Sequence, residues 1–149
     1  MNTTDKSTKV NLAADPKWQE LYVLSEHWQS DLEFYKDDLR FLHHLVDKYM
    51  IWITKSENLE MVREIMLSVF ELQKRCTELI SEVATHKHNL ASLEKDATEE
   101  LWEKVKTGHG EMEMAIYNFV KEFRANRKEV FRITEYIVDS EELSNLLKA

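Results

Sequence analysis

Apolar residues recur at alternating intervals of three and four residues along almost the whole chain. Three segments carry this pattern, beginning at Trp18, Val62 and Trp102, and at least nine positions in each segment are apolar. These intervals bring side chains to one side of an α-helix, and repeats of this length are typical of long helices that pack together. We refer to these positions as the seam.

Turn-forming residues are scarce in the chain. It has two glycines and one proline among 149 residues, far below ordinary usage. Because sheets and irregular loops need such residues, we predict an all-α fold. Helix starts are indicated at Asp15-Pro16, at Ser56 and at Asp96, where a side chain able to cap a helix precedes each seam.

These boundaries predict an elongated antiparallel bundle of three long helices. The helices are expected at residues 15–54, 57–94 and 97–139, with a short C-terminal helix beginning after Ser140. At a rise of about 1.5 Å per residue, each long helix would extend about 60 Å. Such helices resemble spectrin repeats in architecture alone, since the residues themselves carry no family motif.

Both glycines flank one histidine, in the stretch Gly108-His109-Gly110. The seam passes through this stretch without a change of phase, because Val105, His109 and Met112 keep the spacing of four and three. We therefore expect one continuous helix with His109 on its inner side. The alternative is a four-helix bundle broken at Gly108–Gly110, in which the third helix would be much shorter than its neighbours.

The termini, charge and cysteine content constrain the class of protein. Residues 1–14 have few apolar anchors and are predicted to be a flexible tail, which leaves 15–149 as a single domain. A formal net charge of −8 disfavours nucleic acid and anionic membrane surfaces as partners. The single Cys76 cannot form an internal disulfide, and no secretory signal is visible, so a cytoplasmic location is expected.

Four seam positions hold polar residues, namely Ser25, His86, His109 and Asn126. Counting along the helices from the two expected turns places His86 and His109 about four residues, or roughly 6 Å, apart along the bundle. Ser25 falls in an adjacent layer, and Trp28 lies beside it. Asn126 stands alone in its layer and is interpreted as a residue that fixes the register of the helices.

The histidines support more than one interpretation. The first is a self-satisfied cluster of His86, His109 and Ser25, with no cofactor. The second is a zinc or iron site, because imidazole and carboxylate groups are suitable ligands for these metals. A small-molecule site is the third. The expected metal ligands are His86, His109, Glu82, Glu113 and His27.

Large apolar residues also lie outside the seam, and an exposed apolar band of this kind usually marks an interface. Together with the absence of any catalytic motif, this predicts a non-enzymatic interaction or scaffolding module. Its partner would be a second copy of the chain, giving a homo-oligomer, or another helical protein. The alternative function is a metal- or small-ligand-binding bundle. The expected interface residues are Phe34, Phe41, Met66, Phe70 and Phe131.

Overall fold

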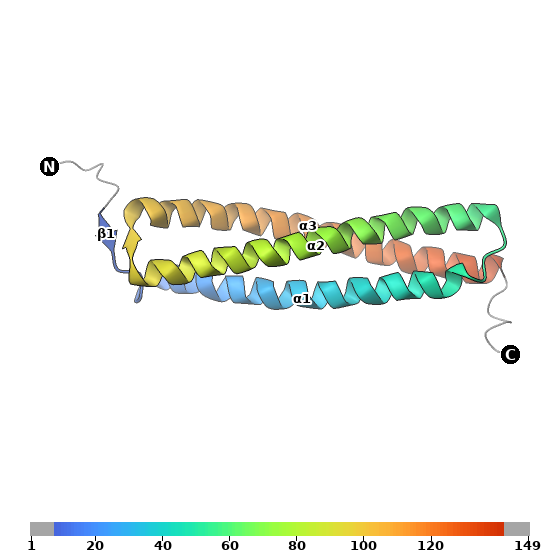
Figure 1. Cartoon of the computed structure of the whole chain (residues 1–149), viewed down its shortest axis with the longest axis horizontal. Helices are drawn as coiled ribbons and strands as arrows, with labels where there is room; N and C mark the ends of the chain where they lie inside the picture. Colours follow the sequence, from blue (N-terminus) through green and yellow to red (C-terminus); the bar gives the residue numbers. More distant parts are fainter. Residues whose placement is uncertain (1–7, 142–149) are drawn as a thin grey trace. The chain divides into compact units, whose positions relative to one another are not determined.

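The computed structural model describes residues 8–141, and helices form most of this part of the chain. The helices are α1 (Pro16–Met50), α2 (Ser56–Lys95) and α3 (Glu99–Ser140), shown in Figure 1. Two short strands, β1 (Lys9–Val10) and β2 (Ala97–Thr98), complete the described elements. The all-α class and the three long helices are therefore confirmed, although α1 ends earlier than predicted.

Side-chain caps account for two of the helix starts. The backbone N–H of Lys17 donates to Oδ1 of Asp15 over 2.8 Å, so Asp15 caps α1 as the sequence predicts. The cap of α3 differs from the prediction, because Leu101 donates its backbone N–H to Oγ1 of Thr98 over 3.2 Å. Thr98 therefore caps α3, and Asp96 lies before β2.

Helix α3 runs without interruption through Gly108 and Gly110. The four-helix alternative, broken at Gly108–Gly110, is therefore wrong. The spacing of Val105, His109 and Met112 correctly indicated a continuous helix, because a loop at this point would not have had to keep the spacing of three and four residues. A Cβ atom placed on either glycine would meet nothing within 4 Å, so the fold does not need these glycines for a close approach between helices.

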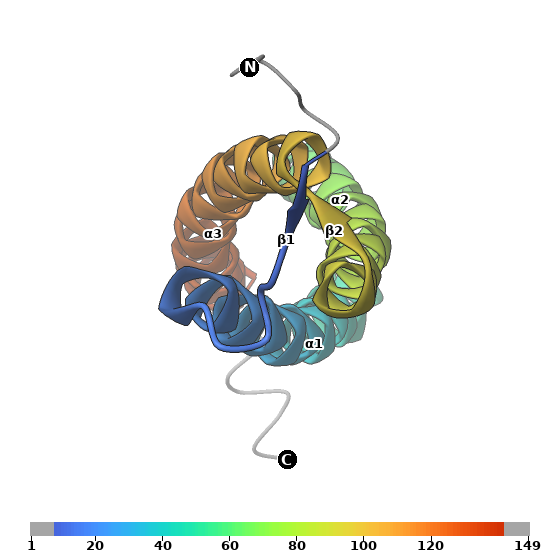
Figure 2. The same cartoon turned by 90° about the vertical axis from the view of Figure 1, so that its left-hand side faces the viewer.

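The N-terminal segment departs from the predicted flexible tail. From residue 8 onward it is folded, because β1 pairs antiparallel with β2, with Lys9 opposite Thr98 and Val10 opposite Ala97. Figure 2 shows β1 lying beside β2. Leu12 is buried in a cluster that includes Trp18 and Trp102. This segment contains too few apolar residues to be recognised from its own sequence, and its burial depends on partners far along the chain.

The end of α3 is joined to the segment between α1 and α2. The Glu141 carboxylate accepts hydrogen bonds from the backbone N–H groups of Thr54 and Lys55, at 3.2 and 2.9 Å. The Thr54 hydroxyl and the Asn58 amide also donate to it, at 2.7 and 2.9 Å. The short C-terminal helix predicted after Ser140 lies in residues 142–149, outside the described part of the chain.

Contacts divide the chain into two compact units, to which all three helices contribute. Unit 1 consists of Met1–Glu33 and Glu78–Tyr117, and unit 2 consists of Phe34–Thr77 and Asn118–Ala149. Seam residues form the buried interior of both, and Cys76 is fully buried among them. No helix within residues 8–141 combines the length and apolarity needed to cross a lipid bilayer.

Candidate functional site

Two histidines meet inside unit 1. His86 on α2 and His109 on α3 are 7% and 5% exposed, and Nε2 of His86 lies 2.9 Å from Nδ1 of His109. That distance is a direct hydrogen bond between the two rings. The two side chains therefore lie close together, as the sequence predicts. They are in direct contact, which is closer than the separation counted from the expected turns.

Trp28 of α1 covers this pair. Its ring centroid lies 4.5 Å from that of His109, with the planes inclined by 27°, and 6.5 Å from that of His86. Ser25, also buried, uses its hydroxyl within α1, where it donates to the carbonyl of Leu21 over 2.8 Å. In place of the predicted cluster of two histidines and a serine, the structure has a histidine pair in which His109 stacks on Trp28.

The pair leaves one ring nitrogen of His109 unsatisfied. Nε2 of His109 is buried and has no hydrogen-bond partner among residues 8–141. If Nδ1 accepts the bond from His86, Nε2 carries a hydrogen without an acceptor, and in the other tautomer Nε2 is an acceptor without a donor. Either state costs about 1–3 kcal/mol unless a water or another group satisfies the atom.

Both histidines are held in their neutral form. Burial lowers the pKa of His86 below its usual value. Burial also lowers the pKa of His109, to about 4, with smaller contributions from the neighbouring His86 and from the positive charge of Lys17. The pair is therefore uncharged near neutral pH, and neutral imidazole is also the form that binds a metal ion.

The predicted metal ligands are not all brought together. His27, Glu82 and Glu113 are exposed, whereas His86 and His109 are buried and bonded to each other. Across residues 8–141, the structure gathers no group of three or more His, Cys, Asp or Glu side chains able to hold a metal ion. Helical spacing placed Glu82 and Glu113 one turn from the histidines, but it did not determine which way those side chains point.

Three of the predicted interface residues lie on adjoining faces of α1 and α3 in unit 2. Phe34 and Phe41 are one heptad apart on α1 and are 64% and 50% exposed. Asp38, between them in sequence, accepts a hydrogen bond from Nε of Arg127 over 2.9 Å. The Arg127 guanidinium lies 4.9 Å from the ring centroid of Phe131, which is 38% exposed. We call the surface formed by these five residues the α1–α3 face.

Phe70 and Met66 of α2 belong to a separate surface. Ser68 of α2 is directed toward α3, because its hydroxyl accepts a hydrogen bond from the Asn126 amide over 2.8 Å. Phe70, two residues later and 60% exposed, is turned by about 200° from Ser68 around the helix axis and points away from α3. The single band predicted from the sequence is therefore divided between different sides of unit 2.

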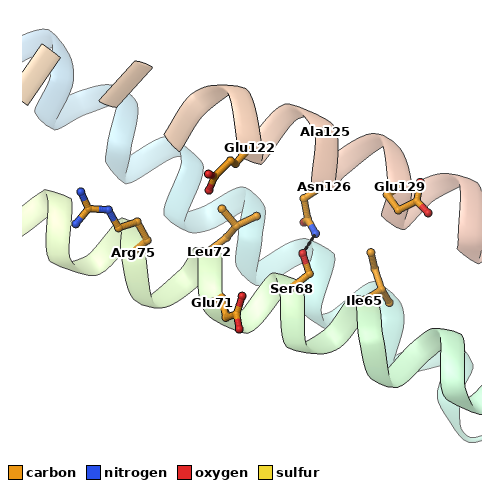
Figure 3. A pocket seen from close by; sticks show the side chains of 9 residues that line it. All are labelled: Ile65, Ser68, Glu71, Leu72, Arg75, Glu122, Ala125, Asn126 and Glu129. Atoms are coloured by element: carbon orange, nitrogen blue, oxygen red, sulfur yellow. Dashed lines mark hydrogen bonds between the residues drawn. The ribbon is translucent and has the colours of Figure 1, made fainter. Parts of the chain in front are cut away.

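A groove of about 510 Å³ runs between α2 and α3 of unit 2 (Figure 3). Sequence reasoning did not find it. The signal was available, because the small residues Ser68 and Ala125 flank the polar seam position Asn126 and leave it incompletely covered. The lining residues are Ile65, Ser68, Glu71, Leu72, Arg75, Glu122, Ala125, Asn126 and Glu129.

A second groove, of about 400 Å³, lies between α2 and α3 of unit 1. His86 and Gly108 both line it, so the space beside Gly108 is open and is not filled by a neighbouring helix. The buried histidine pair therefore has one member at the surface of a groove.

Comparison with known proteins yields no relative. No protein-family model matches the chain, and no curated protein or solved structure matches it either. The chemistry of the described residues therefore carries the functional argument.

Proposed function

We propose that the chain is a non-enzymatic interaction module that self-associates through the α1–α3 face. The observation that carries this proposal is the exposure of Phe34, Phe41 and Phe131 on adjoining helices of unit 2. Burying one phenylalanine side chain contributes roughly 1.5–3 kcal/mol, so a surface that exposes several of them favours association. The cytoplasm is the proposed compartment, supported by the single free thiol of Cys76.

The ion pair of Asp38 and Arg127 would set the orientation of the two copies. It lies between the phenylalanines, and the Asp38 side chain is only 14% exposed. Because the two partners neutralise each other, the face can be covered without leaving an unpaired charge, provided that the pair stays intact. A two-fold arrangement, in which the same face is used by both copies, satisfies this condition.

Net charge opposes this association and provides a test. Each copy carries a formal charge of −8, so two copies repel each other, and added salt screens that repulsion. We expect the dimer to become more stable as salt concentration rises, whereas an interface based on attraction between surface charges would weaken. Sedimentation equilibrium at two salt concentrations measures this difference.

The matched variants are Phe34→Ser/Phe41→Ser on the α1–α3 face and Phe70→Ser on the separate surface of α2. We expect the first variant to be monomeric with an unchanged helix content, and the second to dimerise like the unmodified chain. If the unmodified chain stays monomeric at the highest attainable concentration, self-association through this face is excluded.

A second candidate is a metal- or small-ligand-binding function, supported by the facing ring nitrogens of His86 and His109 and by the unsatisfied Nε2 of His109. Zinc and iron are the metals proposed. A bound small molecule or water would fill the coordination positions that the two histidines leave open. The test is elemental analysis of protein purified without an affinity tag, with melting measured before and after chelation. Absence of stoichiometric metal and an unchanged melting temperature would remove the metal version.

A further inference from the structure

The floor of the groove between α2 and α3 of unit 2 holds an unsatisfied acceptor. Asn126 is 6% exposed, and its Nδ2 donates to the Ser68 hydroxyl over 2.8 Å. Its Oδ1 is buried without a hydrogen-bond partner in the described part of the chain. In Figure 3 the amide reaches from α3 across the groove toward Ser68 of α2. An amide oxygen can only accept, so the group missing at this position is a donor.

The rim of the same groove is acidic. Glu71 extends from α2 and Glu122 from α3, and neither makes an ion pair with any residue between 8 and 141. Glu129 is bonded to Arg132, and Arg75 is the single positively charged lining residue. With Arg132 included, three carboxylates and two guanidinium groups leave one net negative charge around the groove, so the electrostatic potential there favours a cation.

Apolar side chains complete the lining. Ile65 and Leu72 of α2 lie along the groove beside the acceptor and the carboxylates. A ligand that fits this combination has a positively charged donor at one end and an alkyl chain behind it. Carboxylates on two helices and one amide oxygen match the three N–H donors of an ammonium group.

We propose that this groove binds a primary alkylammonium group, supplied by a lysine side chain of a partner or by a free polyamine. A rotation of the Asn126 amide brings Oδ1 to the groove, where one N–H donates to it, while the other two N–H groups face Glu71 and Glu122 and the alkyl chain lies against Leu72. A metal ion is a poorer fit, since the residues that the structure describes include no three-ligand group for one. The site does not depend on the proposed self-association, because it uses α2 and α3 rather than the α1–α3 face.

Titration with 1,5-diaminopentane and with an acetylated lysine peptide, followed by amide NMR, tests the proposal. We expect saturable shifts at Asn126 and Ser68 with at least one of these probes, and no shifts with glutarate, which has the same chain length and opposite charge. Saturation by the peptide identifies a lysine side chain as the source, and saturation by the diamine alone identifies a polyamine. If neither probe saturates, the proposal is overturned.

Two variants separate this site from unspecific attraction to an acidic protein. Asn126→Leu removes the acceptor and suits a seam position, so we expect at least ten-fold weaker binding without loss of the fold. Glu71→Gln/Glu122→Gln should weaken binding by a similar factor. Its matched control, Glu60→Gln/Glu135→Gln, removes the same charge from exposed outer positions of the same two helices and should bind like the unmodified chain.

The proposal is overturned if both double variants weaken binding equally, or if Asn126→Leu binds the diamine as tightly as the unmodified chain does. Dimerisation is measured separately by sedimentation, so the failure of one proposal leaves the other to be judged on its own result.

Discussion

His86 and His109 share one hydrogen bond inside unit 1, with 2.9 Å between Nε2 of the first ring and Nδ1 of the second. Each ring is the polar partner of the other within an interior that is otherwise mostly apolar. The stability of unit 1 therefore depends on both rings staying neutral and on neither ring being left without the other.

Acid should destabilise unit 1 through His109. Its pKa is about 4 in the folded chain against an ordinary value of 6.5, so the unfolded chain binds more protons between these values. The free energy of unfolding should therefore fall as pH decreases from 6.5 to about 4, by about 3 kcal/mol for this group, and should not fall further on its account below that range. Urea denaturation across this pH range measures the effect.

The variant for this measurement is His109→Gln, which should lose most of the decrease. The exposed His88 of α2 provides the control, and His88→Gln should retain the decrease. An identical pH dependence in His109→Gln and the unmodified chain would show that other groups cause the acid sensitivity.

Removing one histidine should cost more than removing both. His86→Leu removes the one partner of Nδ1 of His109 and so leaves both ring nitrogens of His109 buried and unsatisfied, which we expect to destabilise the chain by about 1–3 kcal/mol. The double variant His86→Leu/His109→Leu replaces the pair with residues suited to the seam and should recover most of that loss. A double-mutant cycle from urea denaturation gives the coupling energy, and strictly additive losses would contradict the pairing.

Both glycines of α3 should tolerate alanine. A Cβ at Gly108 or Gly110 would meet nothing within 4 Å, and alanine is favoured over glycine inside a helix by about 1 kcal/mol. Gly108→Ala and Gly110→Ala should therefore each raise the melting temperature of the chain. If the alanine variants melt below the unmodified chain only at concentrations where the chain is dimeric, a second copy approaches α3 at these positions.

The Glu141 carboxylate should hold the segment between α1 and α2. Its pKa is lowered to about 2, first by the Thr54 hydroxyl and further by the Lys55 and Thr54 N–H groups and the Asn58 amide. Because the folded pKa lies below the ordinary value of 4.5, this contribution is complete above that value and is lost as pH falls through about 2. Glu141→Gln should speed amide hydrogen exchange at Thr54 and Lys55, and unchanged exchange would contradict this role.

The proximity of His86 and His109 was predictable, because two short turns and an unbroken seam fix the position of every core residue along the helix axes. Their bonding was not predictable, since it depends on rotamers that adjust to Trp28 and on a hydroxyl that Ser25 uses within its own helix. For Asn126 too, only part was predictable. The seam marks the residue as polar and buried, but the groove beside it arises from the small size of Ser68 and Ala125 on facing helices.

By itself the sequence determined the three helices, the continuity of α3 through Gly108 and the residues that form the interior. The helical period converts a linear spacing into one buried side, so these features depend on neighbours within a few turns. Only the tertiary structure decided that Phe34 and Phe70 lie on separate surfaces, that β1 pairs with β2, and that Glu82 and Glu113 stay exposed. These features depend on which side of one helix meets which side of another, and local spacing carries no information about that choice.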